Sequence, residues 1–462
     1  MAHGMTHHPT LWPPAPGGAT RRGLAQAGVA AAGAAAAGAA CGPLGPGGAA
    51  PAASRQPLTL RWGFYAGQPL TDTVAKALPA FTARYPQITL VQERTTQSGL
   101  DYIAQLAAGS APDVFAACCY ALPVWAAQGL LTNLDPLLKR DGKEIPLADY
   151  APTLMQYWNT PERGQFALPM SAYTRGLYYN RTLFRRKGVP FPDATWDWNR
   201  FRDAMVQLNE PDQKRWGWQV VVDYERTGHY IRQNGGLQVD PKDSSKAVFD
   251  SPQALAALQW LHDRMWKDGA LLKPAEYTTA ALGAQPVVAP ARGTIALVTD
   301  GAWKIPQLMT EAPAEADQWD LAVLPKGPAQ RVTHASTDGW SIPAGSKERD
   351  GAWIVMKFLQ SDAWLEPAIA IAGHQPARKS WLDRYAVLMK QAYPALADKN
   401  IASLTEGYKQ DYAFPLQLFK RHLDSTKLYD ETVAAVFGRN ERPVADAFRE
   451  AAQRVNAINA AP

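Results

Sequence analysis

Cysteine is scarce in this sequence of 462 residues, which contains only three, at positions 41, 118 and 119. So few cysteines cannot form a disulfide framework in an exported protein of this size. A strong excess of one charge is also absent, because 47 Lys and Arg stand against 42 Asp and Glu, a formal net charge of +5. This small excess, without basic runs, argues against nucleic acid as the main partner.

The common catalytic motifs are absent as well. The sequence has no Gly-x-Ser-x-Gly elbow, no His-Glu-x-x-His and no phosphate-binding loop of the Gly-x-x-x-x-Gly-Lys type. The five histidines after the N-terminal segment show no metal-ligand spacing with one another or with cysteine; they are His229, His262, His334, His374 and His422. We therefore expect no metal, no cofactor and no catalysis. A glycosidase with two carboxylates stays open, since such pairs leave no spacing in a sequence.

The N-terminal segment predicts export. Arg21 and Arg22 precede an Ala- and Gly-rich run over residues 23–40, the arrangement of a twin-arginine signal. Cys41 follows small residues, as at a bacterial lipoprotein processing site, although Gly38 stands where such sites have a large aliphatic residue. We predict a signal over residues 1–41 with a lipidated Cys41; the alternative is simple cleavage before an unmodified thiol. Residues 42–57, mostly Gly, Pro and Ala, predict a flexible tether.

The remaining length suggests two or more domains. Strand and helix patterns alternate over residues 58–128, with strand character at 58–65, 88–91 and 114–115 and helical spacing between them. This β-α-β-α-β order implies a parallel sheet with right-handed crossovers. Similar patterns recur as far as an amphipathic helix at the C-terminus, and no later stretch is long and apolar enough to span a bilayer. The sequence thus predicts an α/β fold in two lobes, each a mainly parallel sheet flanked by helices.

Several segments resemble one family. The following segments carry the resemblance in the order of the chain: Phe81-Thr82-Ala83-Arg84-Tyr85-Pro86, Ala108-Gly109-Ser110-Ala111-Pro112-Asp113-Val114, Gly129-Leu130-Leu131, Tyr179-Asn180 with Thr195-Trp196-Asp197, Gly293-Thr294-Ile295-Ala296-Leu297 leading to Gly301 and Trp303, and Pro376-Ala377-Arg378. Together they resemble the extracellular solute-binding proteins of bacterial ABC importers, in the sugar-binding family that includes maltose-binding protein. The resemblance spans roughly residues 58–460 and depends on order and spacing more than on any single motif.

The resemblance implies a two-lobe fold of the periplasmic-binding-protein type II class. One lobe would take residues 58–168 and 326–372, and the other residues 169–325 and 373–462. A solute would then bind between the lobes, where strand ends and helix starts converge. The implied partners are a carbohydrate ligand, the membrane-spanning permease of the importer and, through the lipid anchor, the outer side of the cytoplasmic membrane. We expect a monomer that is either anchored there or free in the periplasm.

Candidate binding residues follow from the chemistry of sugars. Flat aromatic faces stack on the C–H faces of a sugar ring, and planar polar groups bind its hydroxyls in fixed directions. Trp303, which matches a family Trp that stacks on sugar, is the leading candidate, followed by Tyr65, Tyr120, Tyr173, Arg175, Asp300, Trp340, Asp338, Gln97 (with its neighbour Ser98), Trp62 and Arg378.

Each candidate also has a structural interpretation. Trp62 could be a core residue of its strand, Arg175 a surface residue paired with an acid, and Arg378 a tie between lobes. The adjacent Cys118 and Cys119 could be free buried thiols or, at the cost of strain, a disulfide. Sixteen Trp against thirteen Phe is an unusual ratio. We expect the pairs Trp196 and Trp198, Trp216 and Trp218, and Trp260 and Trp266 to be structural.

The function predicted from these observations is capture of a carbohydrate by closure of two lobes and delivery to a permease. The alternatives are an exported carbohydrate-acting hydrolase and a binding protein that feeds a signalling receptor.

Overall fold

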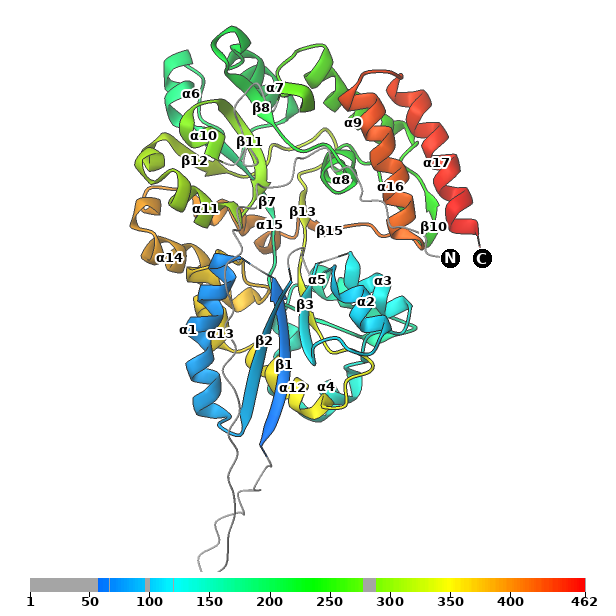
Figure 1. The fold of residues 1–462 in the computed structure, drawn as a ribbon. Coiled ribbons are helices and arrows are strands. Elements are labelled where there is room, and N and C mark those ends of the chain that lie inside the picture. The colour runs from blue at the N-terminus through cyan, green and yellow to red at the C-terminus, as the bar shows by residue number, and fades with distance from the viewer. Residues whose placement is uncertain (1–56, 66, 96–99, 119, 277–287, 462) are drawn as a thin grey trace, which may run out of the picture.

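The computed structural model describes residues 57–461 apart from 66, 96–99, 119 and 277–287. Cys41, Gln97, Ser98 and Cys119 lie outside the described residues, so the predictions that concern them stay predictions. Figure 1 shows the described chain as two lobes, a lower one that contains β1 to β3 and an upper one that contains β7, β8, β11 and β12.

The first lobe is built on a five-stranded sheet in the order β2-β1-β3-β14-β6. Its elements in the first part of the chain are β1 (Leu58–Tyr65), α1 (Gln68–Arg84), β2 (Ile88–Thr95), α2 (Tyr102–Ala107), β3 (Val114–Ala117), α3 (Ala121–Ala127), α4 (Asp135–Asp141), α5 (Pro152–Met155), β4 (Asn159–Thr160), β5 (Gly164–Gln165) and β6 (Leu168–Pro169). Strand β1 pairs in parallel with β2 and with β3, which confirms the predicted β-α-β-α-β unit.

The second lobe is built on a four-stranded sheet in the order β12-β7-β11-β8. The elements of this stretch are β7 (Arg175–Asn180), α6 (Arg181–Lys187), α7 (Trp198–Gln207), β8 (Trp216–Gln219), α8 (Tyr224–Gln233), β9 (Val239–Asp240), β10 (Asp243–Ala247), α9 (Pro252–Trp266), α10 (Ala289–Arg292), β11 (Ile295–Gly301), α11 (Lys304–Glu311) and β12 (Trp319–Ala322). One antiparallel strand, β7, interrupts the mainly parallel sheet that the sequence predicts. Strand β7 pairs antiparallel with both β11 and β12, and only β8 runs parallel to its neighbour β11.

The last part of the chain returns to both lobes. It comprises β13 (Thr333–Ala335), β14 (Gly339–Ser341), α12 (Arg349–Phe358), α13 (Asp362–Ala370), α14 (Leu382–Ala392), α15 (Glu406–Lys409), β15 (Ala413–Pro415), α16 (His422–Val433) and α17 (Val444–Ala460). Strand β14 enters the first sheet antiparallel to β3 and β6. Helices α16 and α17 cover one side of the upper lobe (Figure 1).

Three crossing segments connect the lobes and lie side by side. The segment between β6 and β7 pairs through Tyr173 with Ser336 and through Ala172 with Gln375. Just before Ser336, β13 runs parallel to β15. The Gln375 amide reinforces the junction, because its oxygen accepts a 2.7 Å bond from the backbone N–H of Thr174. These contacts place the residues around Tyr173 and Arg175 between the two sheets.

Most of the tryptophans are structural, as predicted for several pairs. Trp196, Trp198, Trp216 and Trp218 are buried. Trp198 stacks on the half-buried Trp260 with ring centroids 4.3 Å apart. Among the described residues, no helix has the length and apolar character needed to cross a membrane.

Candidate functional site

Residues from both lobes meet where the crossing segments lie, in a group we call the interlobe cluster. Its members are Tyr173, Arg175, Glu225, Asp300, Trp303 and Asp338. Arg175 opens β7 and Asp300 is close to the end of β11, and the antiparallel register of these strands sets Arg175 opposite Gly301. Pairing of strands 125 residues apart in sequence therefore brings the two charged side chains together.

Arg175 is the centre of the cluster. It is buried, with 5% of its surface exposed. Its guanidinium donates to the Glu225 carboxylate and, at 3.3 Å, to Asp300 Oδ1. The backbone is held as well, since its N–H donates to Thr333 Oγ1 at 3.0 Å and its carbonyl accepts from the same hydroxyl. A guanidinium bound by two carboxylates is fixed in position, which makes it a rigid platform.

Trp303 lies directly against this platform. The guanidinium carbon of Arg175 is 4.5 Å from the centre of the Trp303 ring, a cation–π contact. Tyr173 packs edge-on against the same indole at 5.0 Å and 89°. A Cβ at position 301 would lie 2.0 Å from the Trp303 ring, so Gly301 is required for this placement. The indole remains half-buried, and its orientation is set by three neighbours.

Glu225 is a member of the cluster that the sequence analysis missed. It lies in the first turn of α8, whose N-cap Asp223 accepts a 2.7 Å bond from the Arg226 N–H. Burial alone would raise the pKa of Glu225, but the positive charges of Arg175 and Arg226 outweigh burial and hold that pKa well below its usual value. Glu225 is thus a carboxylate at neutral pH. The Asp-Tyr-Glu start of α8 was the available signal, and it reads equally well as ordinary helix capping.

Asp338 reaches the cluster from the other lobe, immediately before β14. Among the described residues its carboxylate forms no hydrogen bond and no ion pair, and it is half-buried. Burial and the nearby negative charge of Glu225 raise the pKa of Asp338 to about 7. A half-buried carboxylate of this kind has neither a hydrogen-bond donor nor a positive charge beside it. A bound molecule can supply either one.

The remaining candidates fall into three groups. Tyr65 and Tyr120 are half-buried at the ends of β1 and at the start of α3. The Tyr120 ring lies 6.3 Å from the ring of His422 on α16, so it faces the other lobe. Arg378 lies apart from the cluster, where it pairs with Asp149 at 2.9 Å and Asp362 at 3.1 Å. These ion pairs give Arg378 a structural role, and its part in ligand binding stays a prediction.

Trp62 and Trp340 do not fit a stacking role. They are 2% and 0% exposed, and their rings pack 6.0 Å apart in the first core, next to Trp364. Both belong to strands inside the five-stranded sheet, and the face of the sheet on which each ring lies is covered by other residues. Neither ring therefore has a face open to a sugar. The prediction of these two as ligand-binding residues is wrong.

Cys118 is a free, buried thiol at the end of β3. Burial raises its pKa to about 12, so it stays protonated and unreactive at neutral pH. Within the part of the chain that the structure describes, no group of three His, Cys, Asp or Glu residues is arranged to hold a metal ion.

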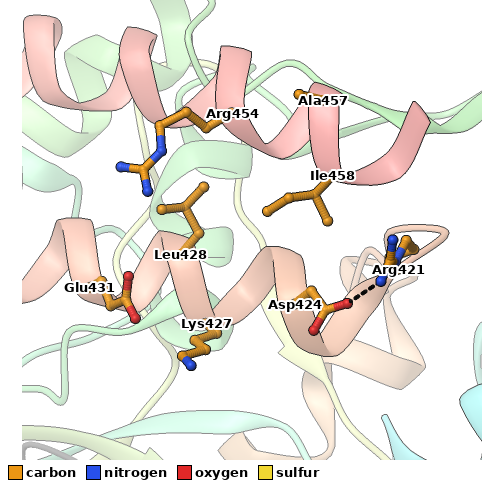
Figure 2. A pocket seen from close by; sticks show the side chains of 8 residues that line it. All are labelled: Arg421, Asp424, Lys427, Leu428, Glu431, Arg454, Ala457 and Ile458. Atoms are coloured by element: carbon orange, nitrogen blue, oxygen red, sulfur yellow. Dashed lines mark ion pairs between the residues drawn. The ribbon is translucent and has the colours of Figure 1, made fainter. Parts of the chain in front are cut away.

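Two grooves lie elsewhere on the surface. A groove of about 610 Å³ between α16 and α17 has Leu428 and Ile458 between charged side chains (Figure 2). Its remaining lining residues are Arg421, Asp424, Lys427, Glu431, Arg454 and Ala457. Another, of about 750 Å³, lies between α1 and β2 and is lined by Thr71, Ala75, Leu78, Pro79, Thr82, Ala83, Gln92 and Arg94. Neither groove has an aromatic ring, so neither offers the flat face that a sugar ring needs.

Comparison with known proteins identifies the family of the chain. The sequence model of the bacterial extracellular solute-binding proteins matches residues 67–366, more than half of the chain. The chain belongs to this family. Its members are extracellular, so this solute-binding protein is an exported protein. A provisionally named binding protein of Brucella abortus (strain 2308) is 26% identical over 216 residues, 46% of this chain. The chain spans about half the length, 51%, of the curated relatives it matches.

Solved structures share the fold. The ABC substrate-binding protein Lmo0181 of Listeria monocytogenes, in complex with cycloalternan, superposes with a TM-score of 0.74 at 18% identity, covering 87% of this chain and 98% of that one. Maltose-bound MalE3 of T. maritima gives 0.71 at 19% identity, with 87% and 100% covered. A solute-binding protein of Thermotoga lettingae bound to α-D-tagatose gives 0.70 at 20% identity, with 87% and 99% covered. The two-lobe α/β fold is therefore that of the periplasmic binding proteins.

Proposed function

We propose that this solute-binding protein captures a carbohydrate at the interlobe cluster and delivers it to the permease of an ABC importer. The observation that carries the proposal is the half-buried indole of Trp303, held against Arg175 at the junction of the two sheets. An aromatic face beside fixed charged groups matches what sugar recognition requires. The structures with the same fold are bound to cycloalternan, maltose and α-D-tagatose, which supports a carbohydrate as the ligand.

In this proposal the mechanism is closure of two lobes. Trp303, Arg175 and Asp300 belong to the second lobe, whereas Asp338 and Tyr120 approach from the first. A solute that touches both sets gains contacts only when the lobes are closed, so binding shifts the population toward the closed form. The three crossing segments would act as the hinge, and the lobe boundaries given above belong to the same proposal. The chain makes and breaks no bond.

The experiment is a thermal-shift screen of the purified protein against mono- and oligosaccharides, followed by small-angle X-ray scattering with the best ligand. A ligand at 100 times its Kd stabilises the folded state by about 2.7 kcal/mol, so a clear rise in Tm is expected. The radius of gyration should fall as the lobes close. If no carbohydrate raises Tm and the protein releases reducing ends from a polysaccharide, the proposal is wrong and the hydrolase alternative replaces it.

We also propose that the protein acts as a monomer held to the membrane by a lipid on Cys41, the residue that ends the signal-like segment. A single acyl chain binds a membrane only weakly and reversibly. Stable anchoring therefore needs a second signal, such as a further acyl chain on the same protein. A Cys41→Ser variant is expected to move from the membrane fraction to the soluble fraction of cells. Equal retention of both forms on membranes would contradict the anchor.

A further inference from the structure

The positive charges in and next to the interlobe cluster are already committed to carboxylates. Arg175 is bound by both Glu225 and Asp300. Arg226, which follows Glu225 on α8, pairs with Asp223 and lies 3.9 Å from the second oxygen of Glu225. Lys304 Nζ lies 4.0 Å from the other oxygen of Asp300. An anionic solute would therefore have to compete with these carboxylates for a counter-charge.

The histidines beside the cluster supply no positive charge. His334 is 1% exposed, and its Nδ1 lies 3.4 Å from Glu225. His374 packs edge-on against Tyr173 at 5.8 Å. Burial lowers the pKa of His334 and lowers that of His374 to about 4, so both rings are neutral at pH 7. His334 Nε2 and His374 Nδ1 are buried and, among the described residues, lack hydrogen-bond partners.

Asp338 differs from the other acids of the cluster, because no positively charged side chain in the described part of the chain pairs with it. Its carboxylate has no ion pair within the described residues and lies near enough to Glu225 for the two negative charges to interact. It stands on the first lobe, opposite the paired acids of the second. When the lobes close on a solute, this carboxylate comes out of water facing whatever the solute presents.

We propose that Asp338 acts as a charge filter, so that the site accepts polyols that are uncharged or carry an amine and excludes acid sugars and sugar phosphates. This inference rests on the proposed function, since it concerns solutes bound at the interlobe cluster. A hydroxyl or ammonium group can donate to the carboxylate. Above pH 7, where Asp338 is ionised, a carboxylate or phosphate of a solute instead meets a like charge in a desolvated setting, and no unpaired Arg or Lys of the cluster offsets it.

The test is calorimetric titration at pH 8 with matched sugars. The probes are glucose, glucosamine and glucuronate, the corresponding galactose set, and the β-1,4-linked disaccharides of both sets. For the wild-type protein we expect the acid of a set to bind at least about 10-fold more weakly than its neutral member, because like charges oppose each other across the closed site. The amine should bind at least as tightly as the neutral sugar.

Three variants locate the effect. Asp338→Asn keeps the shape and removes the charge, and should reduce the acid-to-neutral difference to less than about threefold. Asp338→Glu keeps the charge and should keep the difference. Asp212→Asn removes an exposed acid on the short helical turn before β8 and should behave as wild type.

The outcomes separate this inference from the proposed function. Equal binding of acid and neutral sugars by the wild-type protein overturns the charge filter, as does an unchanged difference in Asp338→Asn. Failure of every neutral sugar, both here and in the thermal-shift screen, removes the proposed function and the filter with it. Equal binding of both sugars by the wild-type protein overturns the inference even if the Asn variant does not fold.

Discussion

Replacing Trp303 by alanine is expected to weaken carbohydrate binding by at least about 30-fold, the equivalent of about 2 kcal/mol. The substitution removes the flat face of the cluster and also the ring on which the Arg175 guanidinium and the Tyr173 edge pack. Because the indole is half-buried at the start of α11 and outside the two cores, the fold should persist. The measurement is calorimetric titration with the carbohydrate that gives the largest thermal shift.

Two further measurements control this expectation. Trp303→Phe retains a flat face and should lose much less affinity than the alanine variant. Circular dichroism and Tm of the ligand-free protein should be close to wild type for both variants. Affinity of Trp303→Ala equal to that of wild type would place the sugar elsewhere on the molecule.

Replacing Arg175 by methionine is expected to destabilise the ligand-free protein by about 3–5 kcal/mol, because it leaves Glu225 and Asp300 without their shared cation. The measurement is urea unfolding at pH 7. Arg140→Met is the matched control, since Arg140 also pairs with two acids, Asp141 and Asp350, but its side chain is 51% exposed. Exposed pairs of this kind contribute about 1 kcal/mol or less.

The loss of stability in Arg175→Met should depend on pH, and the direction of this dependence can be stated. In the wild-type protein the pKa of Glu225 is held below its ordinary value of 4.5, so its contribution to stability is present above pH 4.5 and is lost as the pH falls through the folded pKa. Without Arg175 this carboxyl takes up a proton more readily when folded. The difference in unfolding free energy should therefore be largest near neutral pH and shrink below pH 4.5. A difference that is the same at pH 4 and pH 7 would show that Arg175 acts through packing alone.

Some of the fold could be predicted because local patterns determine it. The strand over Leu58–Tyr65 agrees with the structure at both ends, and its parallel pairing with β2 and β3 follows from the helical crossovers between them. The antiparallel pairings of β7 could not be predicted, because β7 is far in sequence from both β11 and β12 and a buried apolar run carries no sign of direction.

The candidate site shows the same limit. Arg175, Asp300 and Trp303 were singled out one by one, and only strand pairing shows that they form one cluster. Trp62 and Trp340 were misjudged because a Trp near a strand end looks the same whether one or both faces of the sheet are covered. Glu225 was missed because nothing in the first turn of α8 distinguishes an acid that pairs with a distant Arg from one that stabilises the helix.

The most direct test of the central claim is a crystal structure of the protein with the carbohydrate that gives the largest thermal shift. We predict electron density for the sugar between the two sheets, with a ring face against Trp303 and a hydroxyl within hydrogen-bond distance of the Asp338 carboxylate. Density for the sugar in the groove between α16 and α17, or in that between α1 and β2, with the interlobe cluster free of it, would contradict the account.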